Sequence, residues 1–263
     1  MRPMAFALPA SSARCTVPVE AADLPPHIFQ HRYRAASQPV VIRNATLRSA
    51  ADFRAKTTIA ALVDAVGDAV VTLSSANAYS YGREKMSVRK YFEHALGPEA
   101  RVAWAAAADV DGAAPNLFYW FGEHGSEVKS LLSQYPLPRY AKPSTQLAFV
   151  AAGGESSLTE PPALSFGVGP DGSGVPFHFH NDGFSEVMHG AKYWMLYPGG
   201  RKPPRFRANA TSASWLLHDY PKLADGERPM ECLIGPGDLL YFPKGWYHAI
   251  LNVGETVFMS TFL

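Results

Sequence analysis

Three histidines offer the clearest chemistry in this sequence. His178 and His180 stand two positions apart in Val175-Pro-Phe-His-Phe-His180, and His248 ends the run Gly237-Asp-Leu-Leu-Tyr-Phe-Pro-Lys-Gly-Trp-Tyr-His248. Alternate side chains of an extended strand leave the same face, about 7 Å apart, so the first two imidazoles can point into one cavity. Neutral imidazoles suit zinc, iron, copper or nickel. A sheet that closes on itself would bring His248 to them and complete a metal site.

The segments around these histidines are therefore expected to be β-structure. From about residue 145 the chain breaks into short apolar runs separated by glycine and proline, which predicts strands. The nine predicted strands cover 146–151, 163–169, 175–180, 184–189, 191–197, 230–234, 237–242, 246–252 and 255–262. This density of strands is typical of a barrel or a double-sheet jelly roll. One long insertion, 198–229, is expected to carry a short helix near 212–218.

The first half of the chain reads as an arm followed by a helical lead-in. Residues 1–22 are predicted to form the arm, whose composition is that of a degraded or partial signal peptide. Residues 23–263 are predicted to be a single domain with its barrel core at about 145–263. Helices are expected at 24–34, 49–66, 88–96 and 126–135, strands at 38–43 and 69–73, and a surface excursion at 97–116. The fold class is thus mainly β with flanking helices (α+β).

Bulk composition narrows the function. A formal net charge of +1 over 263 residues argues against a nucleic-acid partner, and no apolar run approaches the ~20 residues of a membrane span. The two cysteines, Cys15 and Cys232, are most simply two reduced thiols. The sequons at Asn44 and Asn209 point instead to the secretory pathway. There, a bridge between the cysteines would staple the arm to the region near residues 231–234.

Taken together, the motifs resemble the JmjC, or jumonji-type cupin, domain over residues 164–263. The family pattern joins a His-x-Asp/Glu strand, a Gly-x-Lys strand, and a Gly-Asp/Glu turn that leads through proline to a last histidine. The corresponding elements here are His178-Phe-His180, Gly190-Ala-Lys192 and Gly237-Asp-Leu-Leu-Tyr-Phe-Pro243 before His248. The resemblance implies a double-stranded β-helix, the jelly-roll barrel of the cupins, behind a helical lead-in.

In catalytic members of this family, two histidines and one carboxylate hold iron(II), which leaves room for 2-oxoglutarate and dioxygen. The resemblance assigns the metal to His178, His180 and His248, and a carboxylate of 2-oxoglutarate to Lys192. His180 stands in the carboxylate position, and Asp182 is an outside candidate for the missing acidic ligand. Val175 stands where a hydroxyl group often assists 2-oxoglutarate, and it has none to offer.

The chain is also similar to members of the family that reside in the lumen of the endoplasmic reticulum. This similarity lies in Arg14-Cys-Thr16, Leu73-Ser-Ser-Ala-Asn-Ala-Tyr-Ser-Tyr81 and the ending Ser260-Thr-Phe-Leu263. It implies a luminal address, a disulfide between Cys15 and Cys232, and glycosylation at Asn209.

Three functions remain in competition. The favoured one is a non-catalytic or weakly catalytic protein that acts by binding other proteins, because the metal ligand set is altered. The alternative is an iron(II)/2-oxoglutarate-dependent protein hydroxylase with a three-histidine site. The third is a structural zinc or copper site, since zinc readily accepts three histidines and water. A monomer is expected, because the helical extension that drives dimerisation in some relatives is missing.

Overall fold

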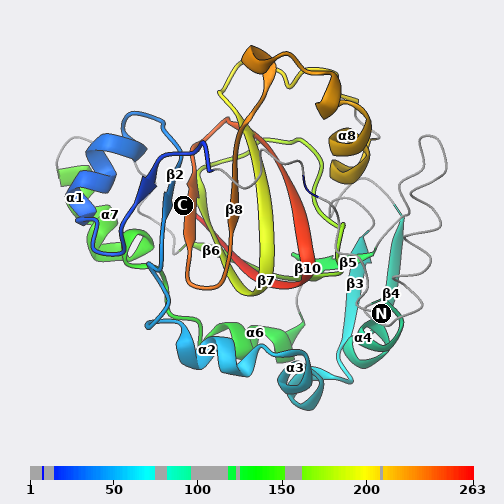
Figure 1. The fold of residues 1–263 in the computed structure, drawn as a ribbon. Coiled ribbons are helices and arrows are strands. Elements are labelled where there is room, and N and C mark those ends of the chain that lie inside the picture. Colours follow the sequence, from blue (N-terminus) through cyan, green and yellow to red (C-terminus); the bar gives the residue numbers. More distant parts are fainter. Residues whose placement is uncertain are drawn as a thin grey trace.

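The computed structural model describes residues 8, 15–74, 82–95, 118–122, 125–151, 162–207 and 210–263 (Figure 1). Most of the predicted arm, the excursion 97–116 and Asn209 lie outside the described residues. The helices are α1 (Pro26–Phe29), a π-helical turn (Gln30–Arg34), α2 (Ala51–Lys56), α3 (Ile59–Val66), α4 (Val88–Ala95), α6 (Ser126–Leu132), α7 (Pro143–Ala151) and α8 (Ser212–His218), with 3-10 turns at Arg139–Ala141, Tyr220–Lys222 and Asp225–Glu227. The strands are β1 (Val19–Glu20), β2 (Val40–Ile42), β3 (Val70–Ser74), β4 (Arg83–Ser87), β5 (Tyr119–Phe121), β6 (Ala163–Gly169), β7 (Gly183–Tyr197), β8 (Met230–Ile234), β9 (Leu239–Phe242) and β10 (Tyr247–Phe262).

Two long strands, β7 and β10, form the spine of the fold. They pair antiparallel from Tyr247 opposite Tyr197 to Phe262 opposite Gly183. The first half of β7 also pairs with β9 and its second half with β8, while the second half of β10 pairs with β6. The two strands therefore pass from one layer into the other, as in a jelly roll (Figure 1). The predicted fold class, mainly β with flanking helices, is confirmed.

β7 and β10 each run unbroken through a region for which the sequence predicts two separate strands. Glycine marks both expected breaks, at 190 and 254, with φ of 75° and 72°. The ladder does not end there. Its register shifts between Val253 and Val257, as in a β-bulge, which bends a strand while the pairing continues. The predicted breaks are wrong, and the bends allow each strand to serve both layers.

The predicted strand at 175–180 is also wrong in form. The segment lies extended along β10 but shares with it only an isolated bridge, His178 opposite His248. The backbone bond from Ile250 N to Val175 O, at 3.0 Å, continues the contact on one side. Pro176 lies between these pairs and has no N–H to donate, so a regular ladder cannot form. Side chains of the extended segment still alternate.

The remaining differences lie in the first 151 residues. Residues 146–151, predicted as a strand, belong to α7, since a short apolar run cannot separate the two states and Pro143 suits a first helical turn. The helix predicted over 49–66 is divided into α2 and α3 because Thr58 caps α3, its hydroxyl accepting from Ala61 N at 3.2 Å. The helix predicted at 24–34 is α1 followed by the π-helical turn. β4 was not predicted because its polar residues show no alternation with apolar ones.

Helices and the insertion cover the outer faces of the sheet, and a separate apolar cluster fills its inside. Helices α2, α3, α4 and α6 pack around Trp120 and Phe166, and α8 packs through Trp215 against β7 and β10. The inner cluster is built on Trp194 and Phe242. No helix in the described part of the chain is long and apolar enough to cross a membrane.

The described end of the predicted arm ties the two layers together. Thr16 N donates to Glu231 O on β8 at 2.8 Å, and β1 pairs in parallel with β2. Between these contacts Val17 is buried in the inner cluster. A disulfide joins Cys15 to Cys232 across 217 positions of sequence. The arm therefore acts as a strap over one side of the barrel.

Candidate metal centre

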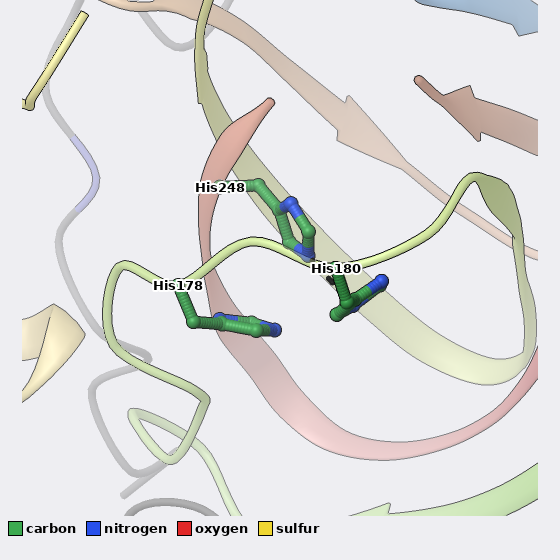
Figure 2. Close-up of side chains that lie close together, drawn as sticks. All are labelled: His178, His180 and His248. Atoms are coloured by element: carbon green, nitrogen blue, oxygen red, sulfur yellow. Dashed lines mark hydrogen bonds between the residues drawn. The ribbon is translucent and has the colours of Figure 1, made fainter. Parts of the chain in front are cut away.

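The three predicted histidines lie together at one mouth of the barrel. His178 and His180 are presented by the extended segment before β7, and His248 is the second residue of β10 (Figure 2). The pair of backbone bonds between residues 178 and 248, at 3.1 and 2.8 Å, fixes the segment against the strand. One ring nitrogen from each imidazole lies within 4.8 Å of the other two. The described residues contain no other group of this kind, and no acidic side chain belongs to this one.

Backbone carbonyls fix the tautomer of every ring. Nδ1 of His178 lies 2.8 Å from Pro176 O, Nδ1 of His248 lies 2.9 Å from Trp246 O, and Nδ1 of His180 lies 2.7 Å from Asn181 O. A carbonyl oxygen only accepts, so each Nδ1 must carry the proton and each neutral ring keeps a lone pair on Nε2. This is the second-sphere arrangement typical of metal-binding histidines.

The Nε2 lone pairs of two of these rings point toward one another. Nε2 of His248 lies 3.2 Å from Nε2 of His180, so two acceptors face one another (Figure 2). Two lone pairs at that distance repel unless a proton or a metal cation lies between them. The donor set therefore fits a divalent ion such as iron or zinc.

Burial keeps these rings in the form that binds metal. It lowers the pKa of His178 to about 4, aided by the nearby charges of His180 and Lys192. The pKa of His248 is held well below its ordinary value and that of His180 is also lowered, in both cases chiefly by burial. A proton therefore competes weakly with a metal ion for Nε2 at neutral pH.

Asp182, the outside candidate for an acidic ligand, is held by other partners. Its Oδ2 accepts from Arg34 Nε at 3.0 Å and from the hydroxyl of Tyr241 at 3.2 Å. Its backbone oxygen accepts from Leu263 N at 3.0 Å. The structure thus places this carboxylate in a clamp between the lead-in and β9, outside the histidine cluster.

Lys192 enters the same interior without an acidic partner. Its side chain is 2% exposed, and Nζ lies 3.1 Å from the ring centroid of Phe258 and 5.8 Å from that of Trp194. Burial alone holds its pKa well below the ordinary value, and no acidic side chain of the described residues pairs with it. Val175, predicted to stand beside this position, is a buried apolar member of the inner cluster.

Further polar atoms beside Lys192 are buried without a hydrogen-bond partner, and the sequence analysis missed them. They are Nε1 of Trp194 and Oδ1 of Asn252. Trp194 is on the same face of β7 as Lys192, and Asn252 is opposite Lys192 in the β7–β10 register. The alternation 192, 194 along β7 was a usable signal for Trp194. Asn252 could not be found without the register.

The structure places the predicted sequon and cysteine residues as follows. Cys15 and Cys232 form the disulfide, and Arg43 donates to Cys232 Sγ at 3.3 Å. Asn44 is exposed with φ of 56°. The hydroxyl of Thr46, the third residue of that sequon, is buried and donates to Gly237 O at 3.2 Å.

The chain as a whole can be compared with known proteins. Residues 25–262 match the model of a family described as a cupin-like domain. The chain is 39% identical to JmjC domain-containing protein 8 of Rattus norvegicus over 250 residues, which are 95% of this chain and 82% of that protein. Against the Homo sapiens protein of the same name it is 38% identical over 255 residues, 97% of this chain and 86% of the relative.

A shorter match reaches an enzyme. Over 99 residues, 34% of this chain and 23% of the relative, the chain is 30% identical to the 2-oxoglutarate and iron-dependent oxygenase JMJD4 of Mus musculus. The family model covers residues 25–262, and the two proteins of the same name match nearly the whole chain. The chain belongs to the cupin-like family of JmjC domain proteins.

Proposed function

We propose that this protein binds a divalent metal ion through His178, His180 and His248, and acts in the secretory pathway mainly by binding other proteins. Oxygenase chemistry in this proposal is weak or lacking. The observation that carries it is the ligand set: three neutral imidazoles with their Nε2 lone pairs converging, and the neighbouring acid Asp182 clamped elsewhere.

The charge of the ligands supports this reading. A carboxylate ligand neutralises part of the charge of iron(II) and strengthens its hold, whereas three imidazoles contribute no charge. Zinc is bound well by three histidines and one water molecule. Val175 offers no hydroxyl to the carboxylate that Lys192 would hold, and the ring of Phe258 covers Nζ of Lys192. These features favour metal binding over turnover of 2-oxoglutarate.

Metal content and succinate release test this proposal together. Protein purified without added metal should contain zinc in preference to iron, and an anaerobic iron(II) titration should show weak binding with no succinate formed from 2-oxoglutarate. His178→Ala and His248→Ala should lose the metal. His27→Ala is the matched control because that histidine is exposed on α1. Tight iron binding with stoichiometric succinate release would refute the proposal.

The secretory address rests on two features. A disulfide persists in an oxidising compartment, and this chain joins Cys15 to Cys232. Sequons at Asn44 and Asn209 are of use only in that pathway. Expression in animal cells should give a mass shift removed by a glycosidase and a mobility change on reduction. Neither change would occur in a protein made and kept in the cytosol.

A three-histidine 2-oxoglutarate oxygenase is the second candidate, and one observation favours it. Lys192 is a buried amine with no acidic partner among the described residues, and unpaired polar atoms of Trp194 and Asn252 lie on the same side. In this reading Lys192 would hold the far carboxylate of 2-oxoglutarate, and iron bound by the three histidines would supply the activation of dioxygen. The histidines orient that site, and the inner aromatic side chains exclude water. Unchanged succinate production by His248→Ala would remove this candidate.

A further inference from the structure

Phe179 has an unusual position. It lies between two of the metal-site histidines, and because side chains alternate along an extended segment it points away from them. It is 57% exposed and is the one aromatic residue among the strongly exposed large apolar side chains of the described chain. An exposed aromatic ring next to a functional site is typical of a contact surface.

Two further rings extend this surface. The ring centroids of Phe179 and Tyr247 are 5.0 Å apart, and those of Tyr247 and Phe206 are 6.4 Å apart. Lys202 Nζ lies 5.0 Å from the centroid of Phe206. We call Phe179, Tyr247 and Phe206 the aromatic rim. It joins the metal-site segment, the start of β10 and the insertion.

The segments that meet at the rim carry no acidic residue, and two of them are basic. Residues 172–181, 198–207 and 243–248 contain no aspartate or glutamate, although the whole chain is nearly neutral at +1. Their basic residues are Arg201, Lys202, Arg205, Arg207 and Lys244. Gly245 N donates to His180 O at 2.9 Å, which holds the turn of Lys244 beside the rim.

The charge on this surface is largely uncompensated. Arg207 pairs with Asp219 at 2.7 Å, but none of the described acidic residues forms an ion pair with Lys202, Arg205 or Lys244. All three of these side chains are exposed. A partner that fits the rim must therefore bring negative charge together with an apolar group for the three rings.

We propose that the aromatic rim binds an acidic peptide segment of another protein, one that carries a large aromatic side chain between its aspartate or glutamate residues. The aromatic side chain would stack on Phe179 and Tyr247, and the flanking carboxylates would face Lys202 and Lys244. The inference rests on the proposed function, protein binding beside the metal site, and gives that partner a chemical class. Charge complementarity favours this occupant over a second copy of this nearly neutral chain.

Fluorescence polarisation with three labelled peptides tests the inference. The first is acidic with a central phenylalanine, the second has its acidic residues replaced by lysine, and the third has alanine in place of phenylalanine. The acidic phenylalanine peptide should bind at least about tenfold tighter than either of the others, and added salt should weaken it. Equal binding of the lysine peptide would overturn the inference.

Variants locate the binding surface. Phe179→Ala should weaken the acidic peptide by about tenfold or more, and Lys202→Glu with Lys244→Glu should do the same through charge reversal. Leu217→Ala is the matched control, since this α8 side chain is 40% exposed and lies outside the rim. Wild-type affinity in Phe179→Ala would refute the inference.

Two further measurements separate the outcomes. Vesicles containing anionic lipid that bind the wild type but not Phe179→Ala, with no peptide preference, would replace the peptide by a membrane surface and overturn the inference. Zinc titration of the Lys202→Glu, Lys244→Glu variant should match the wild type. A wild type that ranks the peptides as expected yet binds no metal would refute the metal site and leave the rim supported.

Discussion

The two faces of the β7–β8 strand pair differ in whether a buried ionisable side chain has hydrogen-bond partners. On the outer side, the carboxylate of Glu231 is 3% exposed and accepts from the hydroxyls of Tyr193 at 2.6 Å and of Tyr220 at 2.9 Å. On the inner side, the amine of Lys192 is as deeply buried, forms no ion pair with a described acidic residue, and lies over the rings of Phe258 and Trp194. A buried charge is tolerated when the fold itself supplies its partners. Where the fold supplies none, burial favours the uncharged form of the group, and a ligand of opposite charge would stabilise the charged form.

Loss of the outer carboxylate should have the largest effect on stability. Glu231→Ala leaves the hydroxyls of Tyr193 and Tyr220 buried without their acceptor, and each such orphan costs about 1–3 kcal/mol. With the cavity added, the free energy of unfolding should fall by roughly 3–5 kcal/mol. Chemical denaturation measures this as a lower midpoint.

A graded pair of variants checks the cause. Glu231→Gln keeps one acceptor oxygen and should lose less stability than Glu231→Ala. Tyr193→Phe removes one donor and leaves the carboxylate bonded to Tyr220, so about 1 kcal/mol is expected. If Glu231→Ala were as stable as the wild type, the outer network would not be a structural feature and the contrast with Lys192 would fail.

Glu186 is intermediate between Glu231 and Lys192, because only one of its two carboxylate oxygens is hydrogen-bonded. The pH dependence of stability should show this. Its Oε2 accepts from Tyr135 at 2.8 Å, while Oε1 has no hydrogen bond and Arg54 stands 3.8 Å away. Burial raises the pKa of this carboxyl to about 7 from an ordinary 4.5. Between those values the folded state binds more protons than the unfolded state, so stability falls as pH rises from about 4.5 to about 7.

Glu186→Gln should remove that slope. The amide cannot ionise and can still accept from Tyr135, so the variant should gain on the wild type as pH rises, by at most about 3 kcal/mol at pH 8. Urea unfolding at a series of pH values measures the difference. Parallel pH profiles for the two proteins would show that the fold does not raise the pKa of Glu186.

The parts that sequence predicted correctly depend on short-range periodicity. The three histidines were found from an alternation of two and from a turn motif, and the alternation survived although 175–180 is not a regular strand. The many short apolar runs after residue 145 sufficed for the fold class. Residues 146–151 failed because an apolar run of that length fits a helix equally well.

What could not be predicted depends on register or on distant contacts. Asp182 was a reasonable candidate ligand until its partner Arg34, 148 positions away, was known. The rings around Lys192 follow from the bend at Gly190 and from the shifted pairing of β10, which the local sequence does not specify. The network of Tyr193, Tyr220 and Glu231 was not foreseen, because its three members come from separate elements of the fold.

Removal of the inner charge should stabilise the protein, opposite to the outer case. Lys192→Met keeps the length and apolar stem of the side chain and removes an unpartnered amine, so the free energy of unfolding should rise by about 1–3 kcal/mol. Burial lowers the pKa of Lys192 in the folded state, so the unfolded state binds more protons between that pKa and 10.5. Wild-type stability therefore rises with pH in this window.

Stability measured against pH, and with and without added 2-oxoglutarate, tests the same variant. Lys192→Met should lose the pH-dependent gain and any stabilisation by added 2-oxoglutarate. Lys202→Met is the control, because that lysine is exposed and far less desolvated. If Lys192→Met destabilised the protein as much as Glu231→Ala, both side chains would stabilise the fold. The proposed difference between the two faces would then be wrong.

The smallest effect is expected in the pH dependence of metal affinity. Ordinary histidines have a pKa near 6.5, so a site of three would lose about tenfold in affinity per ligand when pH falls to about 5.5. Here burial holds His178 at a pKa of about 4 and lowers the pKa values of His180 and His248. Zinc affinity should therefore change by less than about threefold between pH 7 and pH 5.5. Calorimetric zinc titrations of this protein and of a flexible three-histidine peptide, at both pH values, test this expectation. If zinc affinity fell equally steeply in both, the imidazoles of the barrel would be solvated. The inner side of the barrel would then differ little from the surface.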